Sequence, residues 1–247
     1  MTVKARLTAK ATLDKAMVLA AGLGTRMRPL TNTRPKPLVS AGGKTLLDHN
    51  LDQLAASGIT EAIVNVHYLP EQIIAHVQPR TQPRIAISDE RDRILDSGGG
   101  ILKVLDFFGG EPFFSLNADT IWLDGPLRNL DRMRAAFDPA AMDVLLLVAP
   151  AVTTIGWGNR GDFILLQDGT LRRPEKGEVA PFAYTGVAIL RPESFAGRPE
   201  IFSLNRIFDD AAAVGRLFGL RLDGLFMHVG TPEALDEAER ALALHSR

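Results

Sequence analysis

The residues of this chain that could do chemistry begin with a glycine-rich turn. Gly22 and Gly24 stand one residue apart, directly after a short apolar run, and Arg26 and Arg28 follow them. Glycines let backbone N–H groups approach and surround phosphate oxygens, while the two guanidinium groups supply positive charge. The turn therefore fits the binding of a polyphosphate, although a tight connection without a ligand is also compatible with two glycines.

Two common nucleotide-binding motifs do not fit this turn. A dinucleotide-binding loop needs a small residue where Met27 stands, because its helix packs closely on the strand at that point. A P-loop over Gly43–Thr45 would need glycine where Leu38 stands. These departures disfavour a hydride-transfer enzyme and a Walker-type NTPase.

A lysine held between two prolines follows the turn. Pro35 and Pro37 restrict the backbone on either side of Lys36, so that its cation is held at a fixed position. A lone surface lysine does not need such bracing. Lys36 is therefore a candidate for offsetting the charge of bound phosphates.

An asparagine and an aspartate follow another apolar run. Phe113–Leu116 leads into Asn117 and Asp119, and ligands gather at the carboxyl ends of strands in α/β folds. A carboxylate combined with substrate phosphates and waters suits octahedral Mg²⁺, so Asp119 is the predicted metal ligand. The alternative role of Asp119 is that of an acid in a turn or a helix cap.

The elements that must position these residues alternate along the first half of the chain. Strands separated by helical segments imply right-handed βαβ crossovers and a mostly parallel sheet. The predicted strands are Ala16–Ala20, Ala62–Val66, Arg84–Ser88 and Pro112–Leu116, and the predicted helices are Thr45–Ser57, Pro70–Val77 and Ile101–Phe107. A loop, Leu95–Gly100, is predicted before the last of these helices.

The second half is richer in strands, and one α/β domain over residues 15–247 accounts for both halves. The turn Gln167–Thr170 predicts a hairpin at the sheet edge. Thr231, Pro232 and Glu233 have the residue types that open a helix. The first fourteen residues, 1–14, are expected to form a flexible extension. The further predicted strands are Val144–Val148, Phe163–Leu166 and Tyr184–Leu190.

Composition narrows the classes of function. The net charge of −1 disfavours a general affinity for nucleic acid or anionic membranes, which normally requires a basic surplus. No apolar run approaches the length of a membrane span or of a signal peptide core. The chain has no cysteines, which fits a reducing compartment, so we expect a cytoplasmic protein that uses neither disulfides nor thiolates.

The combination of Leu19–Leu30 with Pro35–Leu38 resembles the opening signature of the sugar-phosphate nucleotidyltransferases. The resemblance runs from about Lys15 to Leu242 and implies a Rossmann-like three-layer α/β/α sandwich with a mostly parallel, mixed central sheet. It implies transfer of a nucleoside monophosphate from an NTP to a sugar 1-phosphate, with release of pyrophosphate. It is closest to the short bacterial members that act on N-acetylmuramate 1-phosphate with UTP, as judged from Asp96–Gly100, Arg160–Phe163 and Tyr184–Gly186.

The resemblance also implies roles for the candidate residues. Mg²⁺ would bind Asp119, and Mn²⁺ or Co²⁺ would be tolerated because His228 stands where family members commonly have a second metal-binding aspartate. The catalytic residues would be Arg26, which holds the leaving phosphates, Lys36 and Asp119. The nucleotide would contact Ala21, Gly22, Gly24, Thr25, Arg26, Lys36, Gly98 and Gly99, and the sugar phosphate would contact Asn117, Asp162 and Gly186.

Several assignments stay open. Asp162 is also compatible with a turn acid, His228 with a histidine satisfied by hydrogen bonds, and Lys176 with either a phosphate contact or a solvated side chain. The expected partners are an NTP, UTP above others, and a sugar 1-phosphate, in a monomer or small homo-oligomer without nucleic acid or membrane. The alternative substrates are mannose 1-phosphate with GTP, or another hexose 1-phosphate with UTP or dTTP. The alternative class is a catalytically inactive nucleotide-binding regulatory domain.

Overall fold

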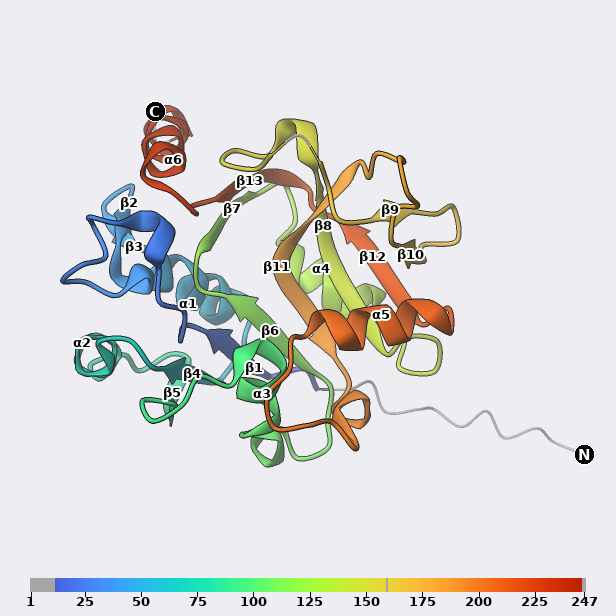
Figure 1. The fold of residues 1–247 in the computed structure, drawn as a ribbon, viewed down its shortest axis with the longest axis horizontal. Helices are drawn as coiled ribbons and strands as arrows, with labels where there is room; N and C mark the ends of the chain where they lie inside the picture. The colour runs from blue at the N-terminus through green and yellow to red at the C-terminus, as the bar shows by residue number, and fades with distance from the viewer. Residues whose placement is uncertain (1–11, 159, 246–247) are drawn as a thin grey trace, which may run out of the picture.

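A seven-stranded mixed sheet organises the computed structural model, which describes residues 12–158 and 160–245 (Figure 1). The strand order is β12-β8-β11-β6-β1-β4-β5. Strand β11 runs antiparallel to both of its neighbours, whereas the other neighbouring pairs in this sheet are parallel. The strands are β1 (Lys15–Leu19), β4 (Glu61–Val66), β5 (Arg84–Asp89), β6 (Phe113–Asn117), β8 (Val144–Pro150), β11 (Phe182–Leu190) and β12 (Leu217–Arg221).

Helices cover both faces of this sheet, because successive side chains of a strand point to opposite faces. Val18 of β1 belongs to a core shared with α1 (Leu46–Ala56), α2 (Pro70–Val77) and α4 (Asn129–Ala136). Met17, its neighbour, belongs to the opposite core, shared with α3 (Asp96–Leu102) and α5 (Asn205–Ala213). Figure 1 shows α5 lying across that second face. The predicted three-layer α/β/α sandwich with a mixed sheet is thereby confirmed.

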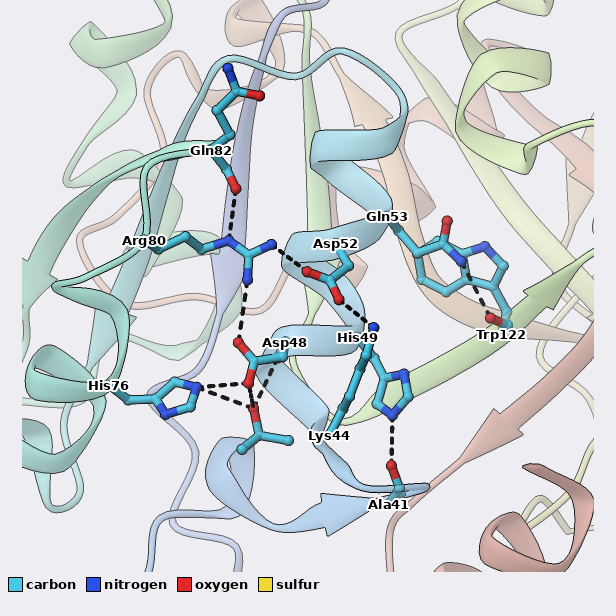
Figure 2. A network of polar contacts seen from close by, with 11 residues as sticks. Ala41, Lys44, Asp48, His49, Asp52, Gln53, His76, Arg80, Gln82 and Trp122 are labelled. Atoms are coloured by element: carbon cyan, nitrogen blue, oxygen red, sulfur yellow. Dashed lines mark hydrogen bonds and ion pairs between the residues drawn. The ribbon is translucent and has the colours of Figure 1, made fainter. Parts of the chain in front are cut away.

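A polar network fastens α1 to the end of α2, as Figure 2 shows. Thr45 caps α1 by accepting a hydrogen bond from the Asp48 N–H, at 3.0 Å. Arg80 then bridges Asp48 and Asp52 at 3.3 and 2.5 Å, and His76 contacts Asp48 at 2.9 Å. Helix α1 is therefore fixed at its N-terminus by its cap and along its outer side by ion pairs.

Two further strands form a smaller sheet beside the main one. Strand β7 (Thr120–Asp124) pairs antiparallel with β13 (Gly224–His228), and the register places His228 opposite Thr120. This pair packs with Met27 and with α6 (Pro232–His245) in a third core. The hairpin β2 (Ser40–Ala41) and β3 (Lys44–Thr45) completes this region.

The predicted elements agree with the structure in most of the first half and depart from it at α3. The helix Pro70–Val77 is confirmed at both ends, and α6 begins at Pro232 as predicted. The loop predicted over Leu95–Gly100 was wrong, because α3 begins at Asp96; the helix predicted over Ile101–Phe107 was wrong in its bounds, since α3 ends at Leu102. The 3₁₀ helices are Thr25–Met27, Lys36–Leu38, Leu105–Phe108, Ala151–Thr153 and Pro192–Phe195.

The predicted hairpin around Gln167–Thr170 forms, but as a sheet of its own. Strand β9 (Ile164–Leu165) pairs with β10 (Leu171–Arg172), and an isolated bridge from Thr170 to Phe218 connects the hairpin to the edge strand β12. The hairpin therefore lies at the predicted edge without extending the main sheet.

The proposed N-terminal extension, 1–14, falls mostly on residues 1–11, which lie outside the described residues. Leu13, at its end, is buried in the core shared with α1. Within the described residues, no helix is both long enough and apolar enough to cross a membrane.

Candidate active site

A cleft of about 580 Å³ opens where β1, β4 and β6 end. Its position agrees with the rule that ligands of α/β sheets bind beyond the carboxyl ends of the strands. Asn117 and Asp119 enter it from the end of β6. The predicted site residues that line the cleft are Ala21, Gly22, Gly24, Thr25, Arg26, Lys36, Asn117 and Asp119, whereas Gly98, Gly99, Asp162, Gly186 and His228 do not line it.

The two glycines of the turn have different structural roles. Gly24 is left-handed, with φ 63°, and a Cβ at this position would lie 2.9 Å from the Cβ of Lys36. The hydroxyl of Thr31 donates a hydrogen bond to the Gly24 carbonyl at 2.8 Å, which fixes the turn against the segment before Lys36. Gly22 lines the cleft with open space around the place of a Cβ. The fold therefore requires glycine at position 24, whereas at position 22 glycine keeps the cleft wall flat.

This difference predicts separate effects of two alanine substitutions. Gly22→Ala is expected to change the free energy of unfolding by less than about 1 kcal/mol, because its backbone is not left-handed. It should nevertheless lower kcat/KM by about tenfold or more, since the added methyl group occupies cleft space where the sequence predicts a phosphate. Gly24→Ala is the control and should destabilise the protein by at least about 1 kcal/mol. Thermal unfolding and steady-state rates check both variants; a normal rate for Gly22→Ala would contradict a phosphate at this wall.

Lys36 and Asp119 form an ion pair inside the cleft. The Lys36 Nζ atom lies 2.6 Å from Asp119 Oδ2, and the lysine side chain is only 11% exposed. Pro37 stands in the short 3₁₀ helix that begins at Lys36, so the lysine is braced as its sequence context predicts. Burial raises the pKa of the Asp119 carboxyl, but the Lys36 ammonium and His228 more than offset this, and the pKa is held below its ordinary value. The pair is thus a fixed positive and a fixed negative charge at the end of β6.

His228 reaches the same charges from β13. Its Nδ1 atom is buried without a hydrogen-bond partner in the structure, and its ring stands edge-on to Trp157 with 5.1 Å between the ring centres. Burial lowers the pKa of the imidazole, and although Asp119 opposes this shift, the cations of Lys36 and Arg26 support it. The neutral form is therefore favoured. Both predicted roles of His228, metal ligand and structural histidine, thus remain predictions.

Gly230 lets His228 and Arg26 approach one another. A Cβ at position 230 would lie 2.7 Å from His228 Nε2 and 3.5 Å from Arg26 Nη1, so a larger residue there would displace the imidazole. Gly230 itself lines the cleft. The turn before α6 thus places both the imidazole and the guanidinium next to Gly230 at the cleft.

The available metal donors suit a cation that is shared with a substrate. In the parts of the chain that the structure describes, no group of three or more His, Cys, Asp or Glu side chains could hold a metal ion alone. Asp119 supplies a charged carboxylate, and the imidazole of His228, whose Nε2 lies next to Gly230 of the cleft lining, is the predicted second donor. A cation with one or two protein ligands normally takes its other ligands from substrate phosphates and water. The donors therefore fit a divalent ion that arrives with a nucleotide.

The glycine run in α3 serves helix packing. The N–H groups of Gly98 and Gly99 both donate to the carbonyl oxygen of Phe202, at 2.9 and 3.1 Å. A Cβ at position 98 would collide with the Phe202 ring, and one at position 99 would collide with the Glu200 carbonyl. These amides are therefore turned away from the cleft. The cleft is lined instead by Asp96 and Ser97, in the first turn of α3.

The predicted sugar-side residues are placed around β11. Gly186 is left-handed, with φ 83°, within a break in the β11 register, and a Cβ there would lie 2.9 Å from the Asn117 Cβ. Its missing side chain thus makes room for Asn117. Asp162 accepts a hydrogen bond from the Tyr184 N–H at 2.8 Å, and burial raises the pKa of its carboxyl. Lys176 is exposed and lies outside the cleft lining.

Several cleft residues carried no recognisable signal in the sequence. Ile94 and Ile201 are partly exposed apolar side chains on the cleft wall. Asn65 and Glu90 line it too, although each is only 2% exposed. Asn65 is the penultimate residue of one predicted strand and Glu90 comes two residues after another, so their positions near the carboxyl edge of the sheet could have been noticed. Their partnership, however, depends on the pairing of β4 with β5.

The chain is similar to known proteins in sequence and in fold. The model of the nucleotidyl transferase family matches residues 15–155. The N-acetylmuramate α-1-phosphate uridylyltransferase of Caulobacter vibrioides is 47% identical over 233 residues, which cover 92% of this chain and 96% of that protein. The enzyme of the same name from Neisseria meningitidis serogroup B is 36% identical, over 91% and 96% of the two chains. A putative glucose-1-phosphate thymidylyltransferase from Bacillus anthracis shares the fold, with a TM-score of 0.77 at 16% identity over 92% and 94% of the chains.

Proposed function

The chain belongs to the nucleotidyl transferase family, and we propose that it joins the nucleoside monophosphate of an NTP to a sugar 1-phosphate with release of pyrophosphate. The observation that carries this proposal is the Lys36–Asp119 ion pair, at 2.6 Å, beside the glycine turn and Arg26 in one cleft. The pair lies in the cleft beside the glycine turn, where a cation and a carboxylate could act on phosphates and a divalent ion. The ion pair therefore favours an enzyme over the alternative class.

The proposed chemistry is an in-line displacement at the α-phosphorus. An oxygen of the sugar phosphate forms the new P–O bond, the bond to the β-phosphate breaks, and pyrophosphate leaves on the opposite side. Two anions must approach each other, so positioning and charge neutralisation supply most of the rate enhancement. Arg26 holds the leaving phosphates, and Lys36 offsets charge around the reacting phosphates. A divalent cation held by Asp119, by His228 as the second proposed ligand and by the phosphates would add positive charge there.

The proposed contacts follow the cleft. Gly22, Gly24 and Thr25 hold phosphates through their backbone, and Ala21 lies at the start of the same turn. The start of α3, at Asp96 and Ser97, contacts the nucleoside, and Gly98 and Gly99 support this contact only through the packing of α3. Asn117 contacts the sugar phosphate, supported by Gly186, and Asp162 is a second contact on that side.

The proposed substrates are UTP and N-acetylmuramate 1-phosphate. The support is the 47% identity to an N-acetylmuramate α-1-phosphate uridylyltransferase, which extends over nearly the whole of both chains. Mannose 1-phosphate with GTP, or another hexose 1-phosphate with UTP or dTTP, is the alternative. The product of the proposed reaction is UDP-N-acetylmuramate.

A substrate panel with pyrophosphate release as the readout tests this proposal. Pyrophosphate is expected only when NTP, sugar 1-phosphate and a divalent ion are all present, and UTP with N-acetylmuramate 1-phosphate should give the highest kcat/KM. Steady hydrolysis of NTP without a sugar phosphate would contradict the transfer reaction. A clear preference for GTP with mannose 1-phosphate would replace the proposed substrates by the alternative pair.

A further inference from the structure

A buried amide–carboxylate pair joins the two walls of the cleft. Asn65 Oδ1 accepts a hydrogen bond from the Ala20 N–H at 2.7 Å, at the start of the glycine turn. Asn65 Nδ2 donates to Glu90 Oε1 at 2.9 Å, and Glu90 Oε2 accepts from the Leu95 N–H at 3.4 Å, just before α3. A continuous series of hydrogen bonds thus runs from the phosphate-binding turn to the start of α3.

Burying the polar groups of this pair costs the fold free energy. Glu90 is 2% exposed, and no ion pair to Glu90 is found among the described residues, so its charge is stabilised by neutral donors. Both neighbouring groups are donors that point at the carboxylate oxygens. Gly100 makes room for the pair, because a Cβ there would lie 2.8 Å from Glu90 Oε1 and 2.9 Å from Asn65 Nδ2. Apolar residues of similar volume would serve stability at least as well.

We propose that Asn65 and Glu90 are positioning residues that hold the glycine turn at a fixed separation from the start of α3. They act on the nucleotide through these two backbone segments, without touching the reacting atoms. The inference rests on the proposed function, because it assigns the phosphates to the turn and the nucleoside to α3. A change in the pair should therefore raise the KM for the NTP and leave the KM for the sugar phosphate nearly unchanged.

The chemistry of the pair allows a reciprocal exchange. In the Asn65→Asp/Glu90→Gln double variant, the new carboxylate accepts from the Ala20 N–H and from the new amide, and the oxygen of that amide accepts from the Leu95 N–H. All three hydrogen bonds are therefore kept, with one of them reversed in direction. In Glu90→Gln alone, every orientation of the two amides leaves two donors facing each other. In Asn65→Asp alone, two carboxylates face each other.

The test measures the two single variants and the double variant. Each single variant is expected to raise the KM for UTP by about tenfold or more, and the double variant to return to within about threefold of the wild-type value. Hydrogen exchange of the unliganded protein should show faster exchange for the amides of residues 20–24 and 95–97 in the single variants, with protection restored in the double. Equal exchange in Glu90→Gln and wild type, or a double variant as impaired as the worse single, would overturn the proposal.

Asn129→Asp is a matched control. Asn129 Nδ2 donates to Asp124 Oδ1 at 2.7 Å, so this variant also places two carboxylates together at a buried asparagine, but outside the cleft lining. It should lower stability without changing exchange at residues 20–24 or the KM for UTP. If the wild-type protein releases no pyrophosphate with any substrate pair, the proposed function fails, and the exchange pattern still decides whether the pair fixes the two segments. Should Asn65→Asp not fold, Glu90→Gln and the double variant are sufficient.

Discussion

Replacing Lys36 by alanine is expected to lower kcat/KM by about a hundredfold or more. The substitution removes a buried cation aimed into the cleft and leaves the Asp119 carboxylate, 2.6 Å away, without its partner. Steady-state pyrophosphate release measures the loss, and thermal unfolding of the same preparation shows whether the variant is folded. Lys36→Arg should also be impaired, because the side chain is buried with its Cβ against Gly24 and a planar guanidinium cannot place a compact charge at the same point.

The chain offers a matched control for this substitution. Lys44 forms an ion pair with Asp52 at 2.7 Å, on the outer side of α1, where both side chains are exposed and belong to the network of Figure 2. Lys44→Ala removes the same kind of charge at a similar distance from a carboxylate, but outside the cleft lining. Its kcat/KM should stay within about twofold of the wild-type value, since exposed ion pairs contribute little. Near-normal activity in a folded Lys36→Ala protein would remove the main residue assignment.

The sequence predicted the strands and helices whose signals are local. Pro70 at the first position and an apolar face define α2, and Thr45 with three spaced leucines defines α1. The end of β6 and the glycine turn follow from strong apolar runs next to residues with distinct chemistry. The position of Asp119 at the carboxyl edge of the sheet could be expected from the end of β6, whereas its contact with Lys36 depends on how the segment after the glycine turn folds back.

The structure departs from the sequence predictions where contacts between residues far apart in the sequence decide the local conformation. A run of three glycines has poor helix propensity, and α3 forms there because Phe202 accepts hydrogen bonds from Gly98 and Gly99 and its ring occupies the space that side chains would fill. Strand β7 needs β13 as its partner, about a hundred residues further along the chain. The Asn65–Glu90 pair likewise exists only once β4 and β5 are side by side.

Asp119→Asn should lower kcat/KM by about a thousandfold, a larger loss than that expected for Lys36→Ala. The amide keeps the shape of the side chain but removes the negative charge that would hold a divalent ion, and it leaves the Lys36 ammonium without a counter-charge in a largely buried place. The metal concentration needed for the half-maximal rate should rise as well. Asp52→Asn is the control, because Asp52 is also paired with a lysine but lies in the network of Figure 2.

The same metal titration tests the second proposed ligand, His228. Imidazole is a poorer partner for Mg²⁺ than carboxylate and suits Mn²⁺ or Co²⁺ better. His228→Ala is therefore expected to raise the Mn²⁺ concentration needed for the half-maximal rate, and His228→Asp to shift the preference from Mn²⁺ toward Mg²⁺. Because Nδ1 of His228 is buried without a hydrogen-bond partner, the alanine variant removes an unsatisfied atom and should not unfold the protein. An unchanged metal requirement in His228→Ala, beside a raised one in Asp119→Asn, would show that Asp119 and the substrate phosphates hold the ion without the imidazole.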